Sequence, residues 1–121
     1  MISRKNIDVT FAGALSGDMA GSLNSDAIDV RDLIYGSIQT IFTGAPVGTM
    51  KLQCSNSLTY ATTGQQPITP VWTDIQDSSI SVAAAGNILY NITNLSYDLI
   101  RVVYTRTSGT GTLIGRMVGK G

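Results

Sequence analysis

The last third of the chain reads Leu99-Ile-Arg-Val-Val-Tyr-Thr-Arg-Thr-Ser-Gly-Thr-Gly-Thr-Leu113, followed directly by Ile114-Gly-Arg-Met-Val118. β-Branched and aromatic residues fill both halves, and a short Gly/Ser/Thr segment separates them. The pattern predicts two β-strands joined by a hairpin turn. Within the first strand we expect Ile100, Val102 and Tyr104 to share one face, because side chains alternate along a strand.

Upstream of this pair, short alternating segments are separated by turn residues. They cover residues 7–11, 27–33, 37–42, 49–54, 71–75, 79–83 and 88–92. The strands at 37–42 and 49–54 flank a Gly/Pro turn, which predicts a second hairpin. About eight strands with a spacing of roughly 8–12 residues are typical of a sandwich or barrel. The prediction is an all-β fold, a single antiparallel jelly-roll β-sandwich with an N-terminal arm.

The first 25 residues differ in pattern from the rest. A strand at 7–11 is followed at 13–25 by a polar stretch that glycines interrupt. Such stretches are uncommon inside compact domains unless they have a role. We expect an arm that orders against a neighbouring subunit, with a long loop as the alternative. The predicted division is an N-terminal strand and arm over 1–25 and a jelly-roll sandwich over 26–121. The apolar residues expected to contact a neighbour are Ile7, Val9, Phe11, Leu15 and Met19.

The composition limits the classes of partner. The 121 residues carry eight basic and eight acidic side chains, so the formal net charge is zero and no basic patch for nucleic acid is predicted. Charged residues make up 13% and hydrophobic residues 43% of the chain. Ordinary soluble domains are about 25% charged. Either a partner covers part of the surface, or a Ser/Thr-rich surface needs few charges. No apolar run approaches the roughly 20 residues of a membrane span, and we expect no membrane partner.

Residues for catalysis are scarce in the sequence. There is no histidine, so Ser-His-Asp and Cys-His arrangements are impossible and ordinary zinc sites are excluded within one chain. The single cysteine, Cys54, alternates with Met50 and Leu52 and is predicted to be a small buried thiol. A carboxylate pair remains open in principle, but no aspartate position is distinctive. The sequence predicts no enzyme and no cofactor.

Two groups of aspartates are candidate calcium ligands. They are Asp26, Asp29 and Asp32, and Asp74 with Asp77. Calcium is bound by several carboxylate and carbonyl oxygens. The spacing does not match an EF-hand loop, and aspartates at such positions commonly form Asx-turns or caps. The turn interpretation is favoured, and no metal site is predicted.

Aromatic and arginine side chains are the remaining candidates for binding. Trp72 and Tyr104 are expected in the core with their polar atoms satisfied at an edge. Tyr60, in a variable loop over 57–70, is the one aromatic residue kept as a possible ligand contact. The arginines at 101, 106 and 116 are predicted to line one sheet. Arg101, Arg106 and Arg116 are therefore candidate interface anchors, with solvated strand faces as the alternative.

Four segments together resemble the framework of discoidin-like, galactose-binding-like jelly rolls: Gln53-Cys-Ser-Asn56, Trp72-Thr-Asp-Ile75, Tyr97-Asp-Leu-Ile-Arg-Val-Val-Tyr104 and Gly109-Thr-Gly-Thr-Leu113. Within that group, the stretch from Ile100 to Leu113 and the ending Gly119-Lys-Gly121 resemble small virion proteins of tailed bacteriophages. The likeness covers roughly residues 30–121. Discoidin-like carbohydrate binders usually place a histidine in their sugar-contacting loops. The lack of histidine here favours a structural role.

The resemblance implies a non-enzymatic phage virion protein. The leading expectation is a capsid decoration, or cement, protein that binds the major capsid protein and copies of itself, as a dimer or trimer. It would be made in the host bacterial cytoplasm and reside on the capsid surface of the virion. The alternatives are a tail or fibre module that recognises host glycans, and a head–tail or neck component.

Overall fold

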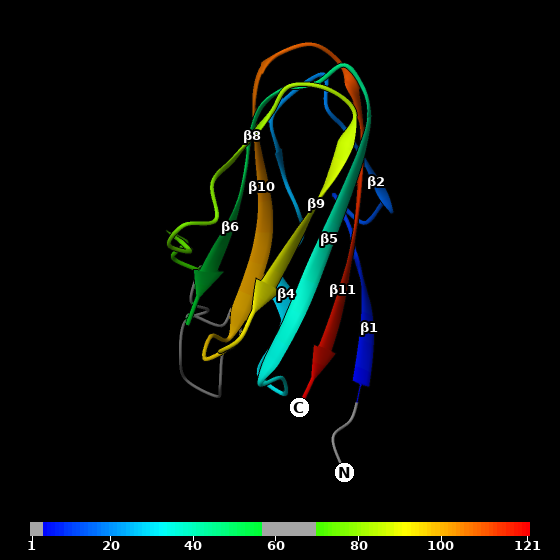
Figure 1. The fold of residues 1–121 in the computed structure, drawn as a ribbon. Helices are drawn as coiled ribbons and strands as arrows, with labels where there is room; N and C mark the ends of the chain where they lie inside the picture. The colour runs from blue at the N-terminus through cyan, green and yellow to red at the C-terminus, as the bar shows by residue number, and fades with distance from the viewer. Residues whose placement is uncertain (1–3, 57–69) are drawn as a thin grey trace, which may run out of the picture.

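The structure is a computed structural model that describes residues 4–56 and 70–121. The described residues form an all-β sandwich of two antiparallel sheets (Figure 1). One sheet has five strands in the order β1-β11-β5-β9, with β2 also paired to β11. The other has six strands in the order β3-β10-β6-β7, with β4 beside β10 and β8 beside β6. The predicted all-β sandwich is confirmed.

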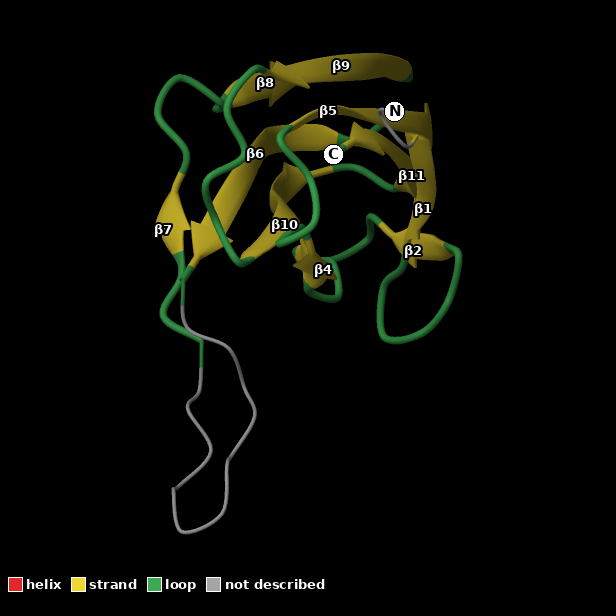
Figure 2. Cartoon of the chain, turned by 90° about the horizontal axis from the view of Figure 1, so that it is seen from below, coloured by secondary structure: helices red, strands yellow, loops and turns green. Residues whose placement is uncertain are grey.

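The strands follow the alternating segments of the sequence closely, with additional short strands. Their bounds are β1 (Arg4–Val9), β2 (Ser16–Asp18), β3 (Leu23–Asn24), β4 (Ile28–Asp29), β5 (Tyr35–Gly44), β6 (Val47–Ser55), β7 (Thr73–Asp74), β8 (Ile80–Val82), β9 (Gly86–Ile92), β10 (Leu99–Ser108) and β11 (Gly111–Lys120). Both described ends of the chain lie at the same end of the sandwich, which faces the viewer in Figure 2.

Neither of the two predicted hairpins forms. β10 and β11 belong to different sheets, and so do β5 and β6. β11 pairs with β5 over ten residues, and β10 pairs with β6 from Leu99 to Ser108. Each short turn is therefore a corner at which the chain crosses from one sheet to the other. Both corners lie at the top of Figure 1. Turn residues were identified correctly, but they specify a change of direction and not the partner of the strand that follows.

The two corners contact each other. The amide of Ala45 donates to the carbonyl of Thr110, with an N···O distance of 2.9 Å. Gly44 and Gly109 have φ values of +84° and +78°, a region that side chains other than glycine's rarely adopt. A Cβ on Gly109 would overlap the carbonyl oxygen of Ala45. Glycine is needed at this contact both for its backbone conformation and for its size.

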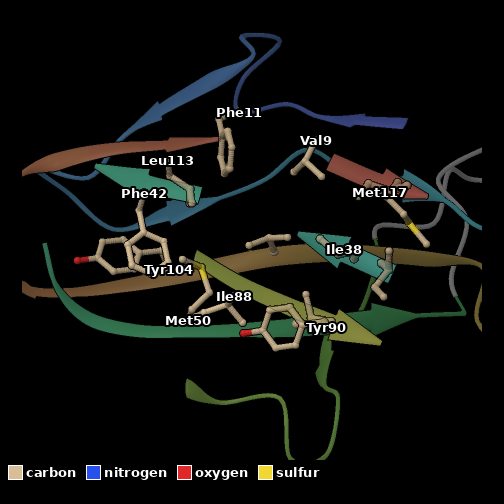
Figure 3. Close-up of a cluster of buried hydrophobic side chains, with 14 of the residues drawn as sticks. Val9, Phe11, Ile38, Phe42, Met50, Ile88, Tyr90, Tyr104, Leu113 and Met117 are labelled. Atoms are coloured by element: carbon tan, nitrogen blue, oxygen red, sulfur yellow. The ribbon is translucent and has the colours of Figure 1, made fainter. Parts of the chain in front are cut away.

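Side chains from both sheets form one core (Figure 3). Ile100, Val102 and Tyr104 are each fully buried, as their alternation predicted. The Tyr104 hydroxyl donates to the carbonyl of Val47 at 3.1 Å, so its polar atom is satisfied at the first residue of β6. Burial of apolar surface between two facing sheets is the main source of stability in such a sandwich.

The expected N-terminal arm is instead part of the sandwich. β1 pairs with β11 over six residues, β2 also pairs with β11, and β3 pairs with β10. Val9 and Met19 are fully buried and Phe11 is 6% exposed, so these three side chains complete the core of their own chain. The prediction that they contact a neighbouring subunit was wrong, because β1 pairs with β11 and the glycine-rich stretch after it contains short edge strands that its sequence period does not reveal.

Two buried serines extend the sheet hydrogen bonding where edge strands are short. Ser25 donates its amide to the carbonyl of Val102, and its Oγ accepts the amide of Val102, both at 2.8 Å. Ser78 Oγ accepts the amide of Leu52 at 3.1 Å and donates to the carbonyl of Ile75 at 2.7 Å. These hydroxyls satisfy backbone groups that a regular edge strand would otherwise pair.

The corner contact predicts that glycine 109 is far less replaceable than a glycine in open space. Gly13 also has a positive φ, +81°, but a Cβ there meets nothing within 4 Å. Gly13→Ala should lower the free energy of unfolding by about 1 kcal/mol, the cost of the backbone conformation alone. Gly109→Ala should lower it by about 3 kcal/mol or more, because steric overlap is added. Urea unfolding followed by circular dichroism measures both, and equal losses would contradict the corner geometry.

The buried hydroxyl of Tyr90 leads us to expect that its removal stabilises the fold. It is 7% exposed, and its hydroxyl has no hydrogen-bond partner among the described residues. An unsatisfied buried hydroxyl is destabilising, so Tyr90→Phe should raise the free energy of unfolding by about 1 kcal/mol near neutral pH. Urea unfolding of both proteins at pH 8 measures this difference, and a less stable variant would contradict the assignment.

Ionisation of Tyr90 makes the free energy of unfolding depend on pH above about pH 10. Burial raises the pKa of Tyr90 to about 12. The unfolded value is about 10, so the unfolded chain releases this proton first as the pH rises. Ionisation therefore favours the unfolded state between about pH 10 and pH 12, and the parent protein loses stability over that range whereas Tyr90→Phe does not. The stability gap between Tyr90→Phe and the parent protein should widen over that range.

Candidate interaction surfaces

The outer side of the five-stranded sheet carries exposed apolar side chains. Leu15, Ile41, Leu89 and Ile114 are 64%, 41%, 55% and 43% exposed, and we call this group the outer apolar face. Three of them lie on the strands β5, β9 and β11, and Leu15 directly precedes β2. Monomeric soluble proteins rarely expose contiguous large apolar patches, and those that do commonly use them for interaction.

The strand register brings these side chains together. Ile41 and Ile114 are direct cross-strand partners, and Leu89 is opposite Gln39 on the neighbouring strand. Cross-strand side chains on one face lie about 5 Å apart. A hollow of about 530 Å³ opens over this region, lined by Asp8, Leu15, Gln39, Ile41, Ile114, Gly115 and Arg116. The face is therefore both apolar and indented.

One charged pair borders the hollow. Arg116 Nε and Asp8 Oδ1 are 4.0 Å apart, at the outer limit of an ion pair, and their side chains are 64% and 61% exposed. They occupy directly opposed positions on β11 and β1. An exposed pair at this separation contributes little to stability. Both groups remain available to a partner.

A second surface lies on the outer side of the six-stranded sheet, around Arg101. We call Lys51, Gln53, Trp72, Asp74 and Arg101 the Arg101 array. Arg101 donates from Nε and one terminal nitrogen to Gln53 Oε1, at 2.9 and 2.7 Å. Gln53 Nε2 donates to Asp74 Oδ1 at 2.8 Å, and Lys51 Nζ donates to Asp74 Oδ2 at 3.1 Å.

An aromatic ring adjoins this hydrogen-bonded chain. The guanidinium carbon of Arg101 lies 4.4 Å from the centroid of the Trp72 ring, a cation–π contact. Trp72 is half-buried and precedes β7, so the prediction that it belongs to the core was wrong. Trp72 precedes the two-residue edge strand β7, so its ring lies at the edge of the sheet, where it packs on Arg101. The array orders one aromatic and four polar side chains in a row.

The electrostatics of the array favour its charged forms. Hydrogen bonds from Gln53 and then Lys51 hold the pKa of the Asp74 carboxyl below its usual value. Partial burial lowers the pKa of the Arg101 guanidinium, which nevertheless stays charged. The surface therefore presents fixed charges of both signs beside an indole ring.

The other predicted contact residues are distributed over the molecule. Arg101 and Arg106 lie on β10, whereas Arg116 lies on β11 in the other sheet, so the three do not line one sheet. Arg106 donates from Nε to the carbonyl of Gly109 at 2.9 Å and thereby braces the corner. Ile7 is half-buried and packs against the core. Tyr60 and residues 57–69 of its loop lie outside the described residues.

Two of the candidate calcium ligands, Asp26 and Asp29, have separate partners. Asp26 Oδ2 accepts the Thr10 hydroxyl at 2.7 Å and the Gly13 amide at 2.8 Å, and these bonds, Thr10's first, lower its pKa. Arg31 donates to both carboxylate oxygens of Asp29, and that contact lowers the pKa of Asp29. Across residues 4–56 and 70–121, no cluster of three or more potential metal ligands occurs.

Cys54 is half-buried rather than fully buried, near the end of β6. Burial raises the pKa of its thiol, which keeps the thiol protonated near neutral pH.

In the described part of the chain, no helix has the length and hydrophobicity needed to cross a lipid bilayer.

Sequence reasoning identified only Leu15 and Arg116 of the residues around the hollow. A usable signal was present for Ile41 and Ile114. Phe42 and Leu113 each have an isoleucine as neighbour, so apolar side chains point to both sides of the strand. A strand with one solvated side normally alternates apolar and polar residues. Adjacent apolar pairs in β5 and β11 therefore indicate a second apolar surface outside the core.

No protein-family model matches the chain, and no curated protein matches its sequence. Similar solved structures include the SPBc2 prophage-derived protein YomS, with 7% identity, a TM-score of 0.52 and coverage of 100% of this chain and 96% of that one. They also include chitosan-binding module 1 of a chitosanase/glucanase from Paenibacillus sp. IK-5. That structure is 10% identical, with a TM-score of 0.50 and coverage of 94% and 93%. At these identities the likeness concerns the fold, and the chain has a jelly-roll-like β-sandwich.

Proposed function

We propose that this chain is a non-enzymatic structural protein of a phage virion, and specifically a capsid decoration protein that binds and stabilises the shell. The observation that carries the proposal is the outer apolar face, in which Leu15, Ile41 and Ile114 line a hollow and Leu89 is exposed on the strand β9. Exposure of this apolar surface to water is unfavourable in free energy, and an assembly partner that covers the surface removes that unfavourable contribution.

Other features of the chain agree with an assembly role. Few charged side chains and zero net charge allow close contact with a neighbour at little desolvation cost. The sandwich is a rigid platform whose edges are tied by Ser25 and Ser78. The prophage origin of YomS, which has a similar fold, is in keeping with a virion location. Repeated weak contacts over a shell would add up through multivalency.

The proposal predicts a high copy number in the particle. Quantitative mass spectrometry of purified virions of the phage that encodes this chain should find it in near-stoichiometric amount relative to the major capsid protein. Recombinant chain should also co-sediment with shells that lack it, and should raise the temperature at which those shells break down. A handful of copies per particle would overturn the decoration role in favour of the tail or neck. Absence from virions would overturn the virion assignment itself.

A second candidate function, glycan recognition by a tail or fibre module, is favoured by the Arg101 array. Carbohydrate sites commonly combine an aromatic ring with fixed hydrogen-bonding groups, and Trp72 lies beside Gln53, Asp74 and Arg101 in that way. The chitosan-binding module of similar fold is a precedent for carbohydrate binding by such a sandwich.

This alternative predicts measurable glycan binding that depends on Trp72. Calorimetry with chitosan oligosaccharides and a printed glycan array are the probes. Trp72→Ala should weaken any binding by about tenfold or more, because a stacking contact is lost. Val71→Ala, at a neighbouring residue that is 71% exposed, is the matched control and should bind normally. Tyr60→Ala tests the contact predicted from sequence. A blank array, or full binding by Trp72→Ala and Tyr60→Ala, would contradict glycan recognition.

A further inference from the structure

We infer that the part of the outer apolar face around Leu15 and Ile114 binds a second copy of this chain, related by a two-fold axis that lies along the boundary between β1 and β11, while Leu89 on the far strand β9 lies outside this contact. The inference rests on the proposed assembly role and names the partner of that surface. It follows from three properties of the face: an apolar centre with a hollow, a projecting side chain at the rim of the hollow, and a charged pair that is self-complementary.

The centre of the face has the shape of a socket. Ile41 and Ile114 are cross-strand partners beneath the hollow of about 530 Å³. Leu15, at 64% exposure, is the most exposed of the lining residues that are apolar. In a face-to-face dimer, Leu15 of each copy enters the hollow of the other and covers the isoleucines. Removal of these side chains from water is the driving force.

The charges favour an identical partner over an unrelated one. Asp8 and Arg116 lie at opposed positions on adjacent strands, 4.0 Å apart and largely exposed. A two-fold axis between their strands exchanges the two positions, so that each Asp8 meets Arg116 of the other copy. In a two-fold interface, if residue i of one copy contacts residue j of the other, then j of the first copy also contacts i of the second. An acid and a base side by side meet this condition, because each acid then faces the base of the other copy. A different protein would need a matching base and acid of its own.

The same axis also fits the apolar residues. Ser16, which follows Leu15, is the cross-strand partner of Ile114. Exchange across the boundary therefore brings Leu15 of one copy towards Ile114 of the other, in register with the charged pair. Zero net charge means that two copies approach each other without net repulsion. The remaining surface, including the Arg101 array on the other sheet, stays free in the dimer.

The first test is the oligomeric state of the full chain. Sedimentation equilibrium and light scattering should show a dimer at micromolar concentration. Ile114→Lys should give a folded monomer, since a 43% exposed residue is not part of the core. Ile34→Lys is the matched control, because Ile34 is 59% exposed but outside the face, and it should remain dimeric. Circular dichroism checks that both variants fold. A monomeric parent protein, or a dimer unaffected by Ile114→Lys, would overturn the inference.

The second test uses the charges and separates a two-fold contact from general stickiness. Asp8→Lys leaves two positive side chains at the site and Arg116→Asp leaves two negative ones. Each variant alone should dimerise at least about tenfold more weakly than the parent, because like charges face each other. An equimolar mixture of the two should dimerise with about the parent affinity, as a heterodimer. Failure of the mixture to recover would overturn the two-fold geometry.

The outcomes also distinguish this inference from the proposed function. A monomer that is abundant on virions would overturn the dimer and leave the decoration role standing. A dimer that is absent from virions would do the reverse. A face that binds only the capsid protein would appear as a monomer in solution whose Ile114→Lys variant no longer binds shells, and that result would overturn the inference.

Discussion

The contact between two chain corners, at 44–47 and 108–111, constrains every long strand in the molecule. At these corners β5 passes into β6 and β10 passes into β11, and each passage changes sheet. Gly44 is in register with Gly111, and Val47 is in register with Ser108, so pairing continues on both sides of the crossing. The four strands therefore behave as one two-stranded ribbon folded over itself. Positions 44 and 109 require glycine, because both have positive φ values and a Cβ at either would overlap the backbone of the other corner.

The folded ribbon also positions both candidate surfaces. Its β5 and β11 half carries Ile41 and Ile114 on the outside of one sheet, while its β6 and β10 half carries Gln53 and Arg101 on the outside of the other. Because the two halves lie back to back around one core, the surfaces face in opposite directions. In the proposed dimer a second copy covers the outer apolar face around Leu15 and Ile114, and the Arg101 array on the opposite sheet stays exposed. That layout suits an assembly protein whose copies engage through more than one contact.

Several polar side chains that the sequence offers as candidate ligands or contacts stabilise local structure. Asp26 holds the turn over residues 10–13, Ser25 continues the pairing of β10, and Arg106 braces the corner. Asp74 joins the edge strand β7 to β6 through Gln53 and Lys51. Edge strands of two or three residues have few backbone hydrogen bonds of their own, so side-chain bonds supply the rest. This use of aspartate and serine explains why their spacing resembled, but did not form, a ligand site.

The sequence by itself determined the class of the fold, the positions of the long strands and the inward side of β10, since alternation depends only on the local geometry of a strand. It also identified the turns. Only the tertiary structure decided that these turns are corners, because one glycine-rich signal serves a hairpin and a crossing equally well. It placed Val9, Phe11 and Met19 inside the core and Trp72 at an edge. It also assembled the outer apolar face, whose members come from four separate segments. Adjacent apolar pairs in β5 and β11 indicate that a second apolar side exists, but only long-range pairing decides which side chains meet there.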